Sequence, residues 1–330
     1  MDGPSEHNRR PASPEPDLSF REAVIDGLAR PQKAIPSRYF YDERGSALFE
    51  QICALEEYYP TRTEIAILEA CCGEIGRILP PSSAVIEMGS GSSTKVRTLL
   101  DSLRAPAAYV PVDISREHLI ASARSLAESY PQLTVVPVWG DFARSLAMPV
   151  LPEAPRVIFF PGSTIGNFTP EGAIALLGGW SGHIGLGGHL IIGVDLKKDP
   201  QTLQAAYDDA AGVTAAFNLN LLVRANRELG ATFDLDGFAH RALYDPEKGR
   251  VEMHLVSGAE QCVRVDDRPF EFAAGETIHT ENSYKYTIGE FQDLARAAGY
   301  QPIAVFTDSE ALFSVHVLQV RRISLSRSPA

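Results

Sequence analysis

Paired cysteines and metal-binding histidine patterns are missing from this sequence. Its 330 residues include four cysteines, none in a Cys-x-x-Cys pair, and eight histidines without a His-x-x-x-His or His-Glu-x-x-His pattern. Adjacent cysteines such as Cys71 and Cys72 bridge each other only with strain. We therefore expect four reduced thiols in a reducing, cytoplasmic compartment and no bound metal.

Long uninterrupted hydrophobic runs are missing as well. The most apolar long stretch, residues 172–196, is broken by glycines and by Ser181, His183 and His189. It predicts a helix, a turn and a strand instead of a membrane span. Residues 1–19 are rich in proline, serine and charge and have no apolar segment of the signal-peptide kind, so they predict a disordered tail.

Positive charge is in short supply. There are 30 basic and 42 acidic side chains, which leaves a net charge of −12. Such a surface repels phosphate backbones and anionic lipids, so we expect neither nucleic acid nor membrane as a partner. The 45% of hydrophobic residues indicates an ordinary globular core, and the length allows one large or two moderate domains. Nothing in the sequence points to an oligomer, and a monomer is our expectation.

What the sequence does contain, from residue 81 onward, is a repeated alternation of strand and helix patterns. Such an alternation predicts a parallel α/β sheet of the doubly wound type. After a later helix pattern, two strands separated by a short turn predict that the chain ends in this sheet with one reversed strand at or near its edge. The five alternating strands are expected at residues 84–88, 109–112, 134–138, 156–160 and 188–194, and the last helix and two strands at 288–298, 302–306 and 312–320.

Two regions do not follow the alternation. Residues 20–80 predict an N-terminal helical segment, interrupted by a turn around Pro60. Residues 197–284 begin with two helix patterns and then switch to the period of two that is typical of antiparallel strands. We interpret them as an inserted α+β substrate-binding domain, with the sheet domain formed by residues 81–196 and 285–330.

The first turn of the alternation, Gly89-Ser90-Gly91, is a candidate ligand site. In open parallel sheets, ligands bind beyond the carboxyl ends of the strands. Glycines there let a ligand approach the backbone, and the next helix, capped by Ser93 or Thr94, offers free N–H groups. A lone Gly-x-Gly is equally consistent with an ordinary tight turn between a strand and a helix.

Acidic residues at the next two strand ends favour a nucleoside ligand. Asp113 is placed to accept hydrogen bonds from both hydroxyls of a ribose. Asp141 can bond an adenine amino group, and Phe142 can cover the face of the base. Each carboxylate alone is more often a helix cap or a loop residue, but both follow successive strands. Thr94 stands where a dinucleotide motif has its third glycine, which leaves an NAD-dependent dehydrogenase as a remote alternative.

Five longer stretches closely resemble the histidine Nα-methyltransferases of ergothioneine biosynthesis, and the resemblance runs from residue 20 to the end. The wider family also contains a tryptophan-type N-methyltransferase, so another amino acid is the alternative substrate. A non-catalytic binding protein on the same fold is a more remote one. The stretches are residues 39–49 (YFYDERGSALF), 57–62 (EYYPTR), 162–167 (GSTIGN), 206–218 (AYDDAAGVTAAFN) and 280–285 (TENSYK).

The resemblance implies an enzyme that uses S-adenosylmethionine, without a metal, to trimethylate the α-amino group of L-histidine. It implies a Rossmann-like class I methyltransferase sheet with an inserted substrate domain. Asn282 and Tyr284 depart from the family pattern beside the imidazole residues. The implied donor site is Gly89, Lys95, Asp113, Asp141 and Phe142; the carboxylate site is Asn167 and Tyr207; the amine site is Tyr41, Phe49 and Tyr58; and the imidazole site is Glu281 and Ser283, with Met253 beside it.

The chemistry assigns two of these residues a catalytic role. The acceptor must be a neutral amine, and Tyr41 is a reasonable acceptor for its hydrogen bond or proton. Phe49 can stabilise the growing alkylammonium by cation–π attraction of about 0.5 to 2 kcal/mol, which needs no N–H and so persists to the third methylation.

Apart from the resemblance, many of these residues have an ordinary structural explanation. The tyrosines and Phe49 could be core side chains, and Met253 shares a strand face with Val251 and Leu255. Lys95 would lie near a helix N-terminus, where a cation is unfavourable.

Overall fold

The structure, a computed structural model, describes residues 18–321 except 92, 145, 147 and 152. Most of the expected N-terminal tail therefore lies outside the described residues. The first helix, α1 (Leu18–Leu28), begins two residues inside the predicted tail. None of the helices within the described ranges is long and apolar enough to cross a membrane.

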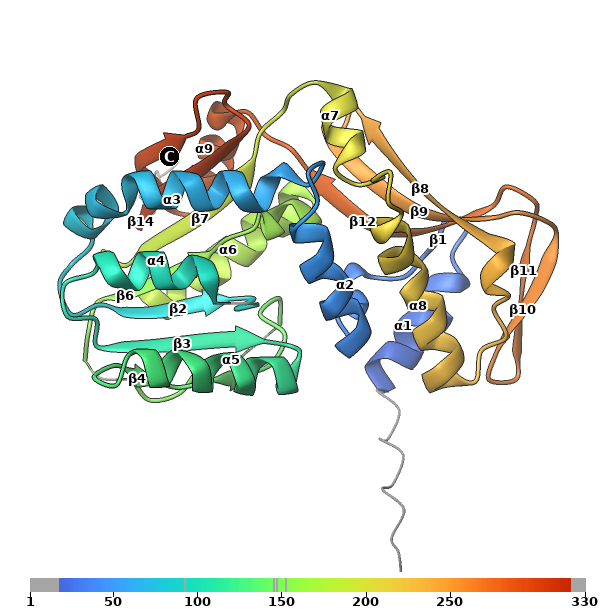
Figure 1. Ribbon diagram of the computed structural model, residues 1–330, viewed down its shortest axis with the longest axis horizontal. Coiled ribbons are helices and arrows are strands. Elements are labelled where there is room, and N and C mark those ends of the chain that lie inside the picture. Colours follow the sequence, from blue (N-terminus) through green and yellow to red (C-terminus); the bar gives the residue numbers. More distant parts are fainter. Residues whose placement is uncertain (1–17, 92, 145, 147, 152, 322–330) are drawn as a thin grey trace, which may run out of the picture.

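An eight-stranded, mainly parallel sheet forms one half of the molecule (Figure 1). Its strands are β2 (Ala84–Met88), β3 (Ala108–Asp113), β4 (Thr134–Val135), β5 (Val138–Trp139), β6 (Arg156–Phe160), β7 (His189–Asp195), β13 (Tyr300–Thr307) and β14 (Phe313–Val320). They follow the order β13-β14-β7-β6-β2-β3-β4, with β5 also beside β3. Only β14 runs against its neighbours β7 and β13. The predicted class I sheet and its reversed strand next to the edge are confirmed.

Helices cover both faces of this sheet, which explains the nearly continuous apolar strands. The helices are α3 (Tyr59–Ile78), α4 (Thr94–Ser102) and α5 (Arg116–Ser129) on one face, and α6 (Pro170–Ile184) and α9 (Ile288–Ala297) on the other. Along β2, Val85 packs with the first group and Ile86 with the second. Each such side chain contributes roughly 1.5–3 kcal/mol when fully buried.

A second, four-stranded sheet has the order β1-β12-β9-β8. Its strands are β1 (Lys33–Ala34), β8 (Phe238–Asp245), β9 (Arg250–Ser257) and β12 (Thr277–Tyr284), and a separate hairpin joins β10 (Gln261–Val265) to β11 (Arg268–Phe272). The helices of this region are α7 (Pro200–Ala205) and α8 (Val213–Leu229). The pattern of the insertion predicted β8 to β11, but neither β1 nor β12.

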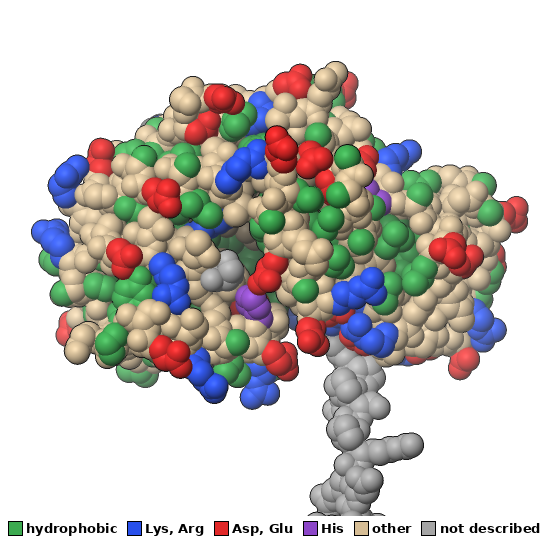
Figure 2. All heavy atoms as spheres, in the orientation of Figure 1, with side chains coloured by type: hydrophobic (Ala, Val, Ile, Leu, Met, Phe, Trp, Pro, Cys, Tyr) green, Lys and Arg blue, Asp and Glu red, His purple; other side chains and the backbone are tan. Residues whose placement is uncertain are grey.

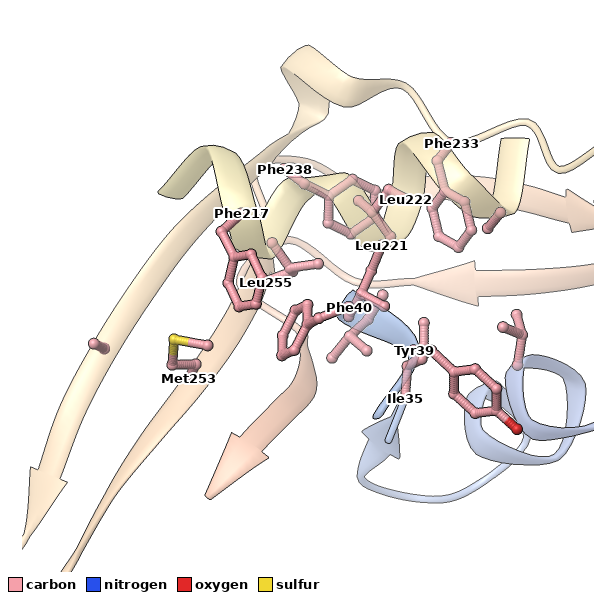
Figure 3. Packing of buried hydrophobic residues seen from close by; sticks show 14 of the residues in the cluster. Ile35, Tyr39, Phe40, Phe217, Leu221, Leu222, Phe233, Phe238, Met253 and Leu255 are labelled. Atoms are coloured by element: carbon pink, nitrogen blue, oxygen red, sulfur yellow. The ribbon is translucent and has the colours of Figure 1, made fainter. Parts of the chain in front are cut away.

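The N-terminal segment shares its hydrophobic core with this second sheet. Figure 3 shows Phe217 and Leu221 of α8 close to Phe40, which lies in the short helix η1 (Ser37–Phe40). Phe40 and Phe217 stack with ring centroids 4.4 Å apart. Helices α1 and α2 (Glu43–Cys53) belong to the same core. Residues up to about Tyr59 therefore pack on the inserted region, whereas α3 packs on the large sheet.

Three local expectations need correction. The turn expected around Pro60 lies earlier, at residues 54–58 between α2 and α3, and Pro60 occupies the first turn of α3, where a missing N–H does no harm. Ser93 precedes α4 in a left-handed conformation, and its side chain makes no capping bond. The expected strand 134–138 is two short strands, β4 and β5.

Candidate active site

A cavity of about 1030 Å³ lies between the two sheets. Its wall includes the carboxyl end of β2, the turns after β3 and β6, helix α2 and strand β12. Figure 2 shows the molecule hollowed between its two halves. All five predicted donor residues line this one cavity: Gly89, Lys95, Asp113, Asp141 and Phe142.

The glycine turn leaves room for a ligand beside the backbone. Gly89 and Gly91 have φ values of +76° and +42°, which are strained for other residues. A Cβ on Gly89 would lie 3.5 Å from the ring of Phe142. The ring of Phe142 is held from behind by Phe160 and Trp180, with centroids at 5.3 and 6.2 Å.

The two donor-site carboxylates also hold their own loops. Asp113 accepts from the backbone N–H of Ser115 at 2.8 Å and of Gly91 at 3.3 Å. Asp141 accepts from the backbone N–H of Ala143 at 2.9 Å. Both side chains also border the cavity, so each can hold its loop and bind a ligand at the same time.

A buried carboxylate compensates the unfavourable position of Lys95. The Lys95 ammonium donates to Glu64 at 2.5 Å, and Glu64 also accepts from the Gly162 N–H at 2.8 Å. Glu64 comes from α3 and is 1% exposed. The pair therefore fixes a cation where the turns after β2 and β6 meet.

Aromatic rings line the opposite side of the cavity. Tyr41 and Phe49 meet edge to face at 5.6 Å, and Phe49 and Tyr58 at 6.2 Å. All three border the cavity. Burial and, next, the nearby Glu281 raise the pKa of Tyr41 well above its ordinary value. Tyr41 therefore stays a phenol, which can accept a hydrogen bond but is a poor proton acceptor.

Asn167 and Glu281 complete the side of the cavity nearest the second sheet. Gly166 lets the turn bearing Asn167 approach β12 closely, since a Cβ there would lie 2.8 Å from the Tyr284 carbonyl oxygen. Burial raises the pKa of Glu281 to about 7, against a lowering effect of Lys285. Glu281 is therefore a carboxyl group that can be ionised or neutral near physiological pH.

Three predicted substrate residues lie behind this wall and do not border the cavity: Tyr207, Met253 and Ser283. The Tyr207 hydroxyl and Ser283 Oγ are 2.6 Å apart. Tyr207 stands behind Tyr58, with ring centroids at 6.2 Å. Met253 pairs with Glu281 across β9 and β12.

Sequence reasoning missed several buried charged groups: Glu64, Glu87, Asp195 and Lys285. Glu87 borders the cavity, and burial raises its pKa to about 8 while the Tyr109 hydroxyl donates to it. The sequence did offer a signal for Glu87, because it is a carboxylate inside the otherwise apolar run 84–88. Lys285 lay at the end of one of the stretches that carry the family resemblance.

One group of side chains has the composition of a metal site. Ligand atoms of Glu252, His254 and His279 lie within 4.8 Å of one another. However, Arg250 donates to Glu252 through both Nε and a terminal nitrogen, and Lys248 is 3.7 Å from the same oxygen. These cations oppose a divalent ion, so we assign none there. Strand pairing assembles this group, which local sequence patterns cannot reveal.

The fold and cavity define the class of protein. A parallel sheet with one reversed strand near its edge, a glycine turn after β2 and carboxylates after the next strands is the arrangement of an S-adenosylmethionine-dependent methyltransferase. Residues 20–320 match the family described as "Histidine-specific methyltransferase, SAM-dependent". The chain belongs to this family.

Proteins with curated descriptions support the assignment. The chain is 40% identical over 304 residues to a histidine N-alpha-methyltransferase of Mycobacterium tuberculosis, covering 90% of this chain and 94% of that one. It is 42% identical over 274 residues to the same-named protein of Mycolicibacterium smegmatis, covering 81% and 84%. Ergothioneine biosynthesis protein 1 of Neurospora crassa is 32% identical over 331 residues, covering 93% of this chain and 36% of that longer one.

Proposed function

We propose that this enzyme transfers three methyl groups from S-adenosylmethionine to the α-amino group of L-histidine, giving hercynine, in the first step of ergothioneine biosynthesis. One observation carries the proposal in the structure. The partly buried carboxyl group of Glu281, suited to an imidazole N–H, borders the same cavity as the five donor residues and the aromatic side chains. The histidine methyltransferases that the chain resembles support the same substrate.

The chain's own residues would bind and orient the reactants. Gly89, Asp113 and Asp141 would hold the donor, which supplies the methyl group. Phe49 and Tyr58 would surround the amine and its growing positive charge by cation–π attraction. Tyr41 would accept a hydrogen bond from the amine and so aim its lone pair. Holding reactants in line can lower the barrier by about 7 to 11 kcal/mol.

Tryptophan is the competing substrate. Its indole offers one N–H, which Glu281 could accept, but lacks the second ring nitrogen of an imidazole. A site built to bond two ring nitrogens rejects a ring that leaves one partner unpaired. We therefore propose preference for histidine, with Met253 as part of the wall that shapes the ring pocket.

The proposal is tested by incubating the pure protein with S-adenosylmethionine and each of the twenty amino acids in turn. With histidine, mass spectrometry should find a product that carries three added methyl groups. Mono- and dimethylhistidine should be detected as intermediates. Donor binding without any methylated product would instead indicate a non-catalytic binding protein.

Other properties remain proposals of ours. They are a monomeric state, a cytoplasmic location, the absence of a metal and of nucleic-acid or membrane partners, and the domain boundaries given above. The four cysteines are free, which is compatible with a reducing compartment. The acidic net charge of −12 supports a small-molecule substrate over phosphate-rich partners.

A further inference from the structure

A buried lysine lies directly behind the substrate side of the cavity. The Lys285 side chain is fully buried. Its ammonium nitrogen lies 2.6 Å from a carboxylate oxygen of Asp195, 2.8 Å from Ser283 Oγ and 3.0 Å from the Tyr207 hydroxyl. An ammonium has three N–H donors and no acceptor, so these three contacts account for all of its hydrogen bonds.

Two buried lysines share the carboxylate of Asp195. Asp195 also accepts from Lys198 at 2.5 Å and from the Tyr59 hydroxyl at 2.8 Å. Among the residues that the structure describes, Asp195 is the one carboxylate within ion-pair distance of both lysines. Buried charges are stable only when compensated. Asp308 acts on Lys198 from farther away, and the charge of Lys285 extends to Glu281 on the cavity side of β12.

The hydrogen bonds from Lys285 leave the hydroxyl groups of Tyr207 and Ser283 as donors. Tyr207 and Ser283 each accept a hydrogen bond from Lys285, and one donates to the other across 2.6 Å. One of their two hydroxyl protons is used in that bond, and no described residue accepts the other. A carboxylate, which only accepts, fits such a wall.

A substrate carboxylate would also face Glu281. Two carboxylates in one buried site repel each other, which raises the free energy of having both ionised. Lys285 acts on Glu281 through space as well, since it opposes the rise in the pKa of Glu281. A cation behind both groups would therefore allow the two negative charges to share the pocket.

We propose that Lys285 is a positioning residue that makes the site select substrates with a free α-carboxylate, by orienting Tyr207 and Ser283 and by supplying the balancing charge. This rests on the proposed function, because it takes an amino acid as the substrate. A purely structural role, in which Lys285 only joins the ends of β7 and β12 through Asp195, predicts an equal loss of activity towards every substrate.

The test compares L-histidine with L-histidinamide, whose carboxylate is replaced by a neutral amide, in wild type and in Lys285→Met. Asp195 keeps Lys198 and Tyr59 as partners, so the variant should fold. We expect wild type to prefer histidine by about 100-fold or more in kcat/KM, the order seen when a site loses a charged hydrogen-bond partner. Lys285→Met should bring this ratio within a few-fold of one, mainly through a higher KM for histidine, and Lys285→Arg should restore part of it.

Lys197→Met is the matched control, because Lys197 pairs with Glu290 and has no contact with Tyr207 or Ser283. It should keep the wild-type ratio. All ratios are measured at one pH, so the different amine pKa values of the two substrates cancel between variants. Equal losses on both substrates in Lys285→Met, or wild type using histidinamide as well as histidine, would overturn the inference. Absence of any histidine methylation would refute the proposed function instead.

Discussion

At the scale of single residues, the site depends on carboxyl groups in different environments. Asp113 and Asp141 lie at strand ends and accept hydrogen bonds from backbone N–H groups. Glu87 is buried and Glu281 is partly buried, and loss of solvent raises their pKa values to about 8 and about 7. The first pair borders the donor side of the cavity, and Glu281 is an acceptor whose charge depends on pH.

Asp113→Ala should weaken donor binding severely. Two ribose hydroxyls would lose a charged acceptor, each such bond being worth about 1.5 to 3 kcal/mol. Titration calorimetry with S-adenosylmethionine measures the loss. Asp101→Ala, in α4 and bonded to Tyr130, is the control and should bind the donor normally. Donor affinity of Asp113→Ala within a factor of two of wild type would refute the assignment.

Glu281→Gln should make the folded protein more stable at higher pH. The folded-state pKa of about 7 lies above the ordinary 4.5, so the stability tied to the neutral carboxyl group is complete below pH 4.5 and is lost as pH rises through 7. Glutamine stays neutral throughout. Urea unfolding should show the variant gaining about 2 kcal/mol on wild type between pH 5.5 and pH 8. A stability difference independent of pH would mean that Glu281 is not buried as described.

At the scale of elements, helix α3 connects the two sides of the donor site. Its Glu64 bonds both Lys95 of α4 and the backbone after β6. Gly193 of β7 leaves space for this carboxylate, since a Cβ there would lie 2.0 Å from it. The position of α3, and not its amphipathic pattern alone, therefore decides where Lys95 points.

Glu64→Ala should destabilise the protein by about 3 to 5 kcal/mol, because Lys95 and the Gly162 N–H lose a buried partner. A double-mutant cycle uses Lys95→Met, Glu64→Gln and the variant that carries both. The double variant should be clearly less destabilised than the sum of the two single variants, since it leaves no buried charge without a partner. Urea unfolding of the four proteins in this cycle measures the coupling. Additive effects would show that the pair is not an energetic unit.

Elements with strong local patterns could be predicted from the sequence, and others could not. The parallel strands other than β4 and β5, and helix α8, which is followed by Gly230, have clear periodicity and stop signals. Strand β1 has two residues and exists only by pairing with β12, whose register shifts after His279. Pro60 was misinterpreted because a proline that breaks a helix also begins one well. The resemblance indicated residues of the cavity wall and three that lie behind it, but not partners far apart in sequence, such as Asp195 and Lys285.

At the scale of the whole molecule, donor and substrate residues come from different halves of the chain. The large sheet supplies the glycine turn and the strand-end carboxylates, whereas α2 and β12 supply aromatic side chains and Glu281. Residues 20–59 pack with the insertion, so the aromatic side chains and Glu281 belong to one folded unit. The ring pocket should therefore be alterable without loss of donor binding.

Glu281→Ala should lower kcat/KM for histidine by about 100-fold or more, because the imidazole N–H loses its acceptor. Donor affinity should stay close to that of wild type. Combined with Met253→Val, the change should narrow the gap between histidine and tryptophan. Steady-state kinetics with both amino acids checks this, and Glu22→Ala, at the α1 side of the cavity, serves as the control. Unchanged histidine kinetics in Glu281→Ala would exclude Glu281 from imidazole binding.

The most direct test of the central claim is a competition between equal concentrations of L-histidine and L-tryptophan in one reaction with limiting S-adenosylmethionine. Mass spectrometry and NMR would identify the products and the methylated nitrogen. The account predicts methylhistidines with every methyl group on the α-nitrogen, proceeding to the trimethylated product, and at most traces of methyltryptophan. Comparable methylation of both amino acids, or methyl groups on the imidazole ring, would contradict it.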